Sequence, residues 1–145
     1  MSHSQLIERL TSQLNREVTT FLRYMLQAAQ IRGAEWEPVR AMYLEEVKDE
    51  LAHAQYLAHQ VSLLGGSPVL DPDLSPPPER VEAMLTKDAD EERTDVRNYI
   101  ELARLAENEG LIALKLKMEE QAADEDAHGH EMLRLAGSAC TVAAV

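Results

Sequence analysis

One pattern occurs twice in this chain of 145 residues, at a constant offset of 75 residues. Glu17 recurs as Glu92, and the segment Glu50-Leu51-Ala52-His53 recurs as Glu125-Asp126-Ala127-His128. In each half, a single glutamate stands 33 residues ahead of a Glu-x-x-His motif, whose two functional residues share one face of a helix. The repeat predicts two similar helical hairpins that bring four carboxylates and two imidazoles to one centre.

Apolar residues follow each other at three- and four-residue steps over four segments, which predicts helices over about 4–32, 38–64, 78–108 and 111–136. Glycines separate the first helix from the second and the third from the fourth. The stretch 67–78 contains five prolines and no helical period, which indicates a long crossover. We therefore predict one all-α domain over residues 1–145, a ferritin-like four-helix bundle of two helical hairpins, with a loose tail over 138–145.

The spacing of the glutamates agrees with the predicted turns. In an antiparallel hairpin, two residues at equal distance from the turn lie at the same height. The midpoint between Glu17 and Glu50 falls at residues 33–34, and the midpoint between Glu92 and Glu125 falls at residues 108–109. Both midpoints coincide with predicted turns, so each pair of carboxylates should lie level, roughly 25 Å from its turn at 1.5 Å per residue.

Composition narrows the class of protein. A net charge of −12 argues against binding to nucleic acid phosphates. The sequence shows neither a signal peptide nor an apolar run long enough to span a membrane. Cys140 has no partner for an internal disulfide, which fits a reducing compartment. We expect a cytoplasmic protein with no nucleic acid or membrane partner.

The paired motifs predict a site for two metal ions, each with one imidazole and one terminal carboxylate. By the repeat symmetry, Glu17 and Glu92 are the terminal ligands and Glu50 and Glu125 bridge the ions; His53 and His128 complete the set. Such oxygen-rich sites suit Fe(II) or Mn(II), whereas zinc prefers fewer ligands and more nitrogen or sulfur. We predict two iron ions per chain, with manganese as the alternative. The competing interpretation is a set of solvated helix faces, but the repeated spacing makes coincidence a poor explanation.

Five further residues are candidates for support of this site. Tyr24 and Tyr99 lie two helical turns beyond the lone glutamates, where a hydroxyl could bond a ligand carboxylate or a phenol could take part in redox chemistry; a plain core position is the alternative. Asp49 and Asp124 precede the bridging glutamates and are candidates to orient the imidazole of the opposite motif, or else lie in solvent. Glu46, one turn before Glu50, is a candidate for the path of metal ions into or out of the site.

At these residues the chain resembles the bacterioferritins, over residues 10–135. The two Glu … Glu-x-x-His sets match the family's ferroxidase centre, and the segments 63–68 and 81–85 agree as well. The resemblance implies ferroxidase activity and a homo-oligomer of at least two subunits. Leu51 stands where the family has the methionine that binds haem, so no haem is expected there. The family's fifth helix, which helps to build a 24-subunit shell, is not expected after residue 137.

The leading functional prediction is a ferroxidase that oxidises Fe(II) with dioxygen or peroxide for iron storage or detoxification. A rubrerythrin-like or catalase-like peroxide scavenger is the main alternative, although the chain has no Cys-x-x-Cys. A mini-ferritin that protects DNA is less consistent with the sequence, because one chain carries the whole ligand set and no basic tail is present. A helical assembly without a metal is the remaining alternative.

Overall fold

The computed structural model describes residues 3–138, and within them it contains four long helices and no strand. The helices are α1 (Ser4–Gln30), α2 (Glu37–Leu63), α3 (Val81–Asn108) and α4 (Ile112–Leu135), and a short 3-10 turn, η1 (Ala34–Trp36), precedes α2. The predicted all-α, ferritin-like fold is confirmed. The predicted tail falls largely on residues 139–145, which, with Cys140, lie outside the described residues.

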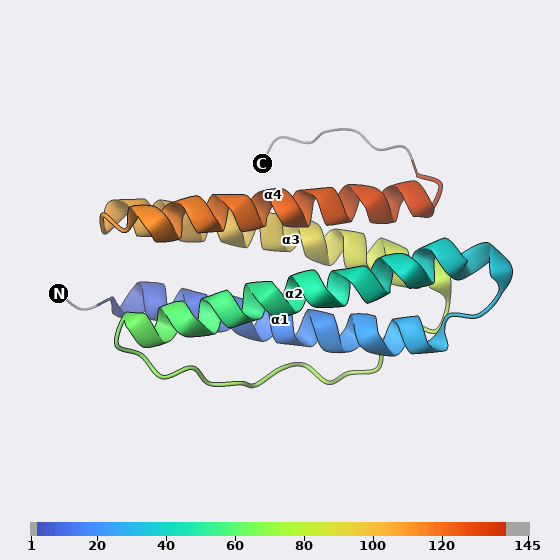
Figure 1. Ribbon diagram of the computed structural model, residues 1–145, viewed down its shortest axis with the longest axis horizontal. Coiled ribbons are helices and arrows are strands. Elements are labelled where there is room, and N and C mark those ends of the chain that lie inside the picture. The colour runs from blue at the N-terminus through green and yellow to red at the C-terminus, as the bar shows by residue number, and fades with distance from the viewer. Residues whose placement is uncertain (1–2, 139–145) are drawn as a thin grey trace.

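The bundle consists of two antiparallel hairpins (Figure 1). The helices α1 and α2 pack against each other along their length, as do α3 and α4, while contacts between the two hairpins are fewer. Residues 64–80 connect α2 to α3 and run back along the outside of the bundle beside α1, so that α2 and α3 point in the same direction (Figure 1). Backbone N–H groups of this crossover donate to Asn15 and Thr19, which fix it against α1.

The helices α2 and α3 end in glycine turns of the same kind. At the end of α2, the N–H of Gly66 donates to the carbonyl of Val61; at the end of α3, the N–H of Leu111 donates to the carbonyl of Ala106. In both turns the glycine before the donor, Gly65 or Gly110, has a positive φ, which only glycine adopts without strain. These hydrogen bonds satisfy carbonyl groups in the last turn of each helix. They also fix where the crossover and the turn of the second hairpin begin.

The helix bounds differ from the sequence-based ones by at most three residues. The largest difference is at α3, which begins at Val81 rather than at Pro78, because Arg80 is extended, with φ −94 and ψ 138. The run of prolines keeps the residues before each ring extended, so the helix starts only after the run has ended. The difference leaves the register of the second hairpin unchanged.

The core is divided into two apolar clusters, one toward each end of the bundle. The first contains Leu6, Leu10 and Met118, and the second contains Tyr43 and Met132. Between them, the middle of each helix carries buried polar side chains instead of apolar ones. No helix within residues 3–138 is long and apolar enough to cross a membrane.

We predict that Gly110→Ala destabilises the protein by about 1 kcal/mol, because a Cβ at a φ of +74 is strained. An added Cβ there would meet no atom within 4 Å, so the loss would report backbone strain alone. Urea unfolding of the two proteins measures the difference. Gly110→Asn is the matched control and should lose less, since asparagine tolerates the left-handed region better; equal losses would contradict the explanation.

Candidate metal centre

The six predicted ligand residues lie together in the middle of the bundle, although they come from four different helices. The helix α1 contributes Glu17, α2 contributes Glu50 and His53, α3 contributes Glu92, and α4 contributes Glu125 and His128. All six are buried, and the four glutamates are at most 1% exposed. A cluster of carboxylates so far from water requires compensation by protons or by cations.

The geometry divides these residues into two overlapping groups. One group consists of Glu17, Glu50, His53 and Glu125; the other consists of Glu50, Glu92, Glu125 and His128. Within each group, one potential ligand atom per residue lies within 4.8 Å of all the others. Glu50 and Glu125 belong to both groups, which is the position expected of bridging carboxylates. The assignment of the six residues as ligands remains a prediction, and this arrangement supports it.

Each imidazole is held by an aspartate of the other hairpin. Asp124 lies 3.0 Å from Nε2 of His53, and Asp49 lies 3.2 Å from Nε2 of His128. A carboxylate can only accept, so each Nε2 donates to its aspartate and each Nδ1 faces the glutamates, with Nδ1 of His128 at 3.1 Å from Oε1 of Glu50. Of the two alternatives left open for these aspartates, the structure favours the orientation of an opposite imidazole.

The two tyrosines also cross between the hairpins. The hydroxyl of Tyr99, on α3, donates to Oε1 of Glu17 at 2.8 Å, and the hydroxyl of Tyr24, on α1, donates to Oε1 of Glu92. Both tyrosines are fully buried. The lone glutamates are therefore each fixed by one hydrogen bond from the opposite hairpin, which leaves their second oxygens, Oε2, without a partner.

The electrostatics follow from this crowding. Burial, and then the charges of Glu17 and other glutamates of the cluster, raises the pKa of both Glu50 and Glu125 well above the ordinary value. Burial also raises the pKa of Glu92. Burial acts in the same direction on Glu17, but hydrogen bonding with Glu50 and His53 outweighs it and lowers its pKa. The metal-free cluster thus holds protons more tightly than exposed glutamates do.

Glu46 lies near the centre but makes no hydrogen bond through its Oε2 atom. It is 5% exposed, and burial, followed by the charge of Glu92, raises the pKa of Glu46 to about 10. Its position beside the cluster is compatible with the predicted role on a path for metal ions, and that role remains a prediction.

The cluster passes a test for fit to metal ions. Five carboxylate oxygens of Glu17, Glu50, Glu92 and Glu125, together with Nδ1 of His53, are buried without a hydrogen-bond partner. Nδ1 of His53 lies 2.9 Å from Oε1 of Glu125, but the two atoms are not aligned for a hydrogen bond. Buried polar atoms are rarely left unpaired. Here they converge, and four carboxylates would neutralise two divalent ions, so the donor set fits Fe(II) or Mn(II).

Sequence reasoning missed a polar network that adjoins Glu17. Gln13 donates to Glu17 at 2.8 Å and to Asp95 at 3.0 Å, and Arg16 donates to Asp95 at 2.6 Å. Burial raises the pKa of Asp95 to about 7, with the charge of Glu17 as the next cause. Helical spacing could have found these residues, because Gln13 lies one turn before Glu17 and Asp95 lies three residues after Glu92.

A second network was also missed, at the position that the repeat relates to Gln13. Asp88 is fully buried one turn before Glu92 and accepts hydrogen bonds from Arg23, Gln27 and Tyr43 at 2.7–2.8 Å. The ring of Tyr43 lies 5.0 Å from that of Tyr24. These contacts hold the end of the bundle next to the cluster in one arrangement.

A four-helix bundle with a buried cluster of glutamates and histidines is typical of carboxylate di-metal proteins. Comparison with known proteins gives the family. Residues 7–137 match the family model for ferritin, described as a ferritin-like domain, and the chain belongs to this family. No match was found among curated proteins.

Solved structures agree with this assignment. A ferritin-like, diiron-carboxylate protein from Bacillus anthracis str. Ames is 32% identical, with a TM-score of 0.89 over 94% of this chain and 99% of that one. The bacterioferritin of Desulfovibrio desulfuricans is 21% identical, with a TM-score of 0.84 over 92% of this chain and 79% of that one. A dodecameric thioferritin from Bacteroides fragilis is 23% identical, with a TM-score of 0.75 over 90% of this chain and 85% of that one. The last two show the fold alone.

We predict that the metal-free protein loses stability as the pH rises from about 5 to 8. A carboxyl whose pKa is higher in the folded than in the unfolded chain binds more protons when folded, so its effect on stability worsens above the unfolded pKa. Glu125→Gln should raise the free energy of unfolding of the metal-free protein on the order of 1–2 kcal/mol near pH 8 and less near pH 5. Glu120→Gln, on the exposed face of α4, should change little.

Urea unfolding at both pH values measures this. An equal effect of Glu125→Gln at the two pH values would contradict the prediction. Adding Mn(II) should stabilise the original protein but not the Glu125→Gln variant to the same degree, since metal ions replace the protons of the cluster.

We also predict that Asp124→Asn weakens metal binding roughly 10–100-fold, because it removes the acceptor that fixes the ring of His53. Titration with Co(II), followed by its visible absorbance, measures the affinity. Asp126→Asn is the matched control two residues away, since Asp126 pairs with His130 at 3.7 Å and not with an imidazole of the predicted ligand set in the described contacts. If both variants bind Co(II) alike, Asp124 does not orient the imidazole.

Proposed function

We propose that the protein is a ferroxidase that oxidises Fe(II) to Fe(III) with dioxygen or peroxide, for iron storage or detoxification. The observation that carries the proposal is the buried, unpaired and converging set of oxygen and nitrogen donors in one chain. Membership of the ferritin family supports an iron-related function at the level of the family.

In this proposal, Fe(II) is the substrate and the six residues hold two ions. Glu17 with His53 and Glu92 with His128 would each hold one ion, and Glu50 and Glu125 would be shared. Two Fe(II) ions give up two electrons when they become Fe(III). These two electrons, with two protons, reduce dioxygen to hydrogen peroxide or reduce hydrogen peroxide to two molecules of water. Manganese is the alternative metal.

The residues of the chain contribute positioning and charge. Asp124 and Asp49 hold the imidazoles in the tautomer that presents Nδ1, and the tyrosine hydroxyls hold the lone glutamates. Ordered ligands bind an ion without first giving up rotational freedom. The four carboxylates favour the higher charge of Fe(III) over Fe(II), and the two apolar clusters at either end keep bulk water away.

Subunit association belongs to the same proposal. One of the structural relatives is described as dodecameric, and we propose that this chain also forms a homo-oligomer of at least two copies. Exposed apolar side chains on α1 and α2, among them Met25, Leu44 and Leu51, are candidates for the contact. Leu51 offers no thioether, and we propose that no haem binds at that position.

We predict that stepwise addition of Fe(II) to the metal-free protein in air gives a fast rise of ferric absorbance in the near ultraviolet that breaks at two ions per chain. Glu50→Ala removes a shared carboxylate and should abolish the fast rise. Glu45→Ala, on the exposed side of the same helix, should leave it unchanged.

Turnover that continues beyond the break would favour storage over a fixed pair of ions. The absence of a fast rise in the original protein would refute the ferroxidase proposal and would leave a manganese-dependent or structural role.

A further inference from the structure

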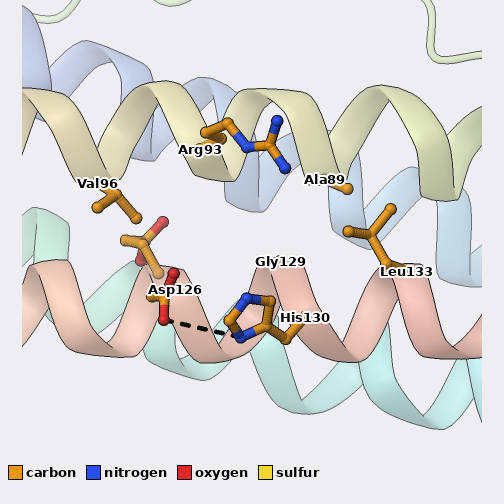
Figure 2. A pocket seen from close by; sticks show the side chains of 8 residues that line it. Ala89, Arg93, Val96, Asp126, Gly129, His130 and Leu133 are labelled. Atoms are coloured by element: carbon orange, nitrogen blue, oxygen red, sulfur yellow. Dashed lines mark ion pairs between the residues drawn. The ribbon is translucent and has the colours of Figure 1, made fainter. Parts of the chain in front are cut away.

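A small cavity opens between α3 and α4 and reaches a residue of the cluster (Figure 2). Its volume is about 30 Å³, and its lining includes Glu125 and Gly129. Glu125 is fully buried, and neither of its carboxylate oxygens has a hydrogen-bond partner. The cavity therefore connects the surface of the second hairpin with a residue that belongs to both groups of the candidate metal centre.

The lining selects by size. Ala89, Val96 and Leu133 give it apolar walls, while the exposed Arg93 and the pair of Asp126 and His130, 3.7 Å apart, carry its polar groups (Figure 2). The volume leaves room for a single small molecule. A hydrated divalent cation is larger than this space, whereas a small neutral molecule can enter it.

Exposed carboxylates also reach the cluster from another pair of helices. The side chains of Asp49 and Asp124 are 58% and 47% exposed, and each contacts an imidazole of the cluster. Both reach across between α2 and α4, since Asp49 of α2 contacts His128 of α4 and Asp124 of α4 contacts His53 of α2. Exposed carboxylates that can attract Fe(II) are thus in contact with the imidazoles without passing through the cavity between α3 and α4.

The two halves of the repeat differ at the residues that line the cavity. At the same offset of 75 residues, Ala89 corresponds to Leu14 and Gly129 corresponds to Ala54. Leu14 and Ala54 are buried in the first apolar cluster, so larger side chains occupy the equivalent seam between α1 and α2. The six candidate ligands repeat, whereas at these two positions of the lining the second hairpin has the smaller residue.

Gly129 has no evident structural reason to be glycine. It lies in the middle of α4 and is not among the glycines with positive φ. An added Cβ would meet Cβ of Glu92 at 3.4 Å, an ordinary van der Waals contact. Glycine inside a helix costs about 1 kcal/mol relative to alanine. The chain carries this cost, and the space that a methyl group would fill beside the cluster stays empty.

We propose that the cavity between α3 and α4 is the route by which a small neutral oxidant, dioxygen or hydrogen peroxide, reaches the candidate metal centre at Glu125. The inference rests on the proposed ferroxidase function and specifies which face of the bundle the oxidant uses. Metal ions and oxidant then approach the centre from different sides.

Two variants should close the route. Gly129→Ala fills the space next to Glu92, and Leu133→Trp covers the lining from the half-buried end. The rate of Fe(II) oxidation, measured by stopped flow at several concentrations of dioxygen or of hydrogen peroxide, should fall several-fold in both variants. Two matched controls, Ala54→Gly in the first hairpin and Leu116→Trp on the exposed face of α4, should keep the original rate.

Two further measurements do not depend on turnover. Xenon applied under pressure to crystals of the metal-free protein should occupy the cavity and should be lost in Gly129→Ala. Titration with Co(II) should give the same stoichiometry and affinity in the original protein and in both variants. Loss of Co(II) binding in Gly129→Ala would mean that this glycine serves the ligands, and Leu133→Trp would then decide the question.

The outcomes separate the two proposals. Slower oxidation with both oxidants supports a common route, and slower oxidation with only one identifies that molecule as its occupant. Unchanged rates in both variants overturn the route while the ferroxidase function stands. If the original protein oxidises no Fe(II) with either oxidant, the ferroxidase function itself fails, and the inference fails with it.

Discussion

The mutual repulsion of four buried glutamates is the constraint on which the rest of this structure depends. Their side chains are almost completely removed from water, and no lysine or arginine contacts them directly in residues 3–138. Like charges at such distances in a medium of low dielectric constant cannot all remain ionised without compensation. The surrounding residues compensate part of this charge: hydroxyl and amide groups donate hydrogen bonds to two of the carboxylates, and the imidazoles face the other two. A set of oxygens remains unpaired, and their number and charge suit two divalent cations.

The electrostatic cost of buried carboxylates is concentrated at the middle of the bundle. Toward either end, the helices return to apolar contacts, with Leu10 and Met118 in one cluster and Tyr43 and Met132 in the other. The apolar ends supply the stability that the polar middle lacks, as functional sites generally require of the rest of a fold. Asp88 and its three donors are the exception in the second cluster, a buried carboxylate that is satisfied entirely by the protein.

Much of this arrangement could be predicted from the sequence because the repeat carries geometry. A fixed distance of 33 residues across each turn determines which helical positions are level, so Glu17 could be placed opposite Glu50 without any structure. The fold class followed from the same turns and from the prolines of the crossover. The start of α3 could not be read as well, because Pro78 is as acceptable within a first helical turn as it is before one.

The polar surroundings were harder to predict than the cluster. Whether Asp49 faced an imidazole or solvent depended on the rotation of one hairpin against the other, which no spacing within a helix determines. Gln13 and Asp95 were overlooked because they have no partner of the same type at the offset of the repeat. The repeat reveals what the two halves share. A difference between them, such as Gly129 at the position equivalent to Ala54, can be interpreted only when the packing around it is known.

The exchange of partners between the hairpins has a consequence for how the molecule is assembled. Tyr24 and Asp49 of the first hairpin hold Glu92 and His128 of the second, and Tyr99 and Asp124 return the contact to Glu17 and His53. Contacts inside each hairpin are local in sequence and form readily, whereas contacts between hairpins must wait for the long crossover to close. The bound ions would therefore link two hairpins that fold separately. Metal binding would be the last step in the association of the hairpins.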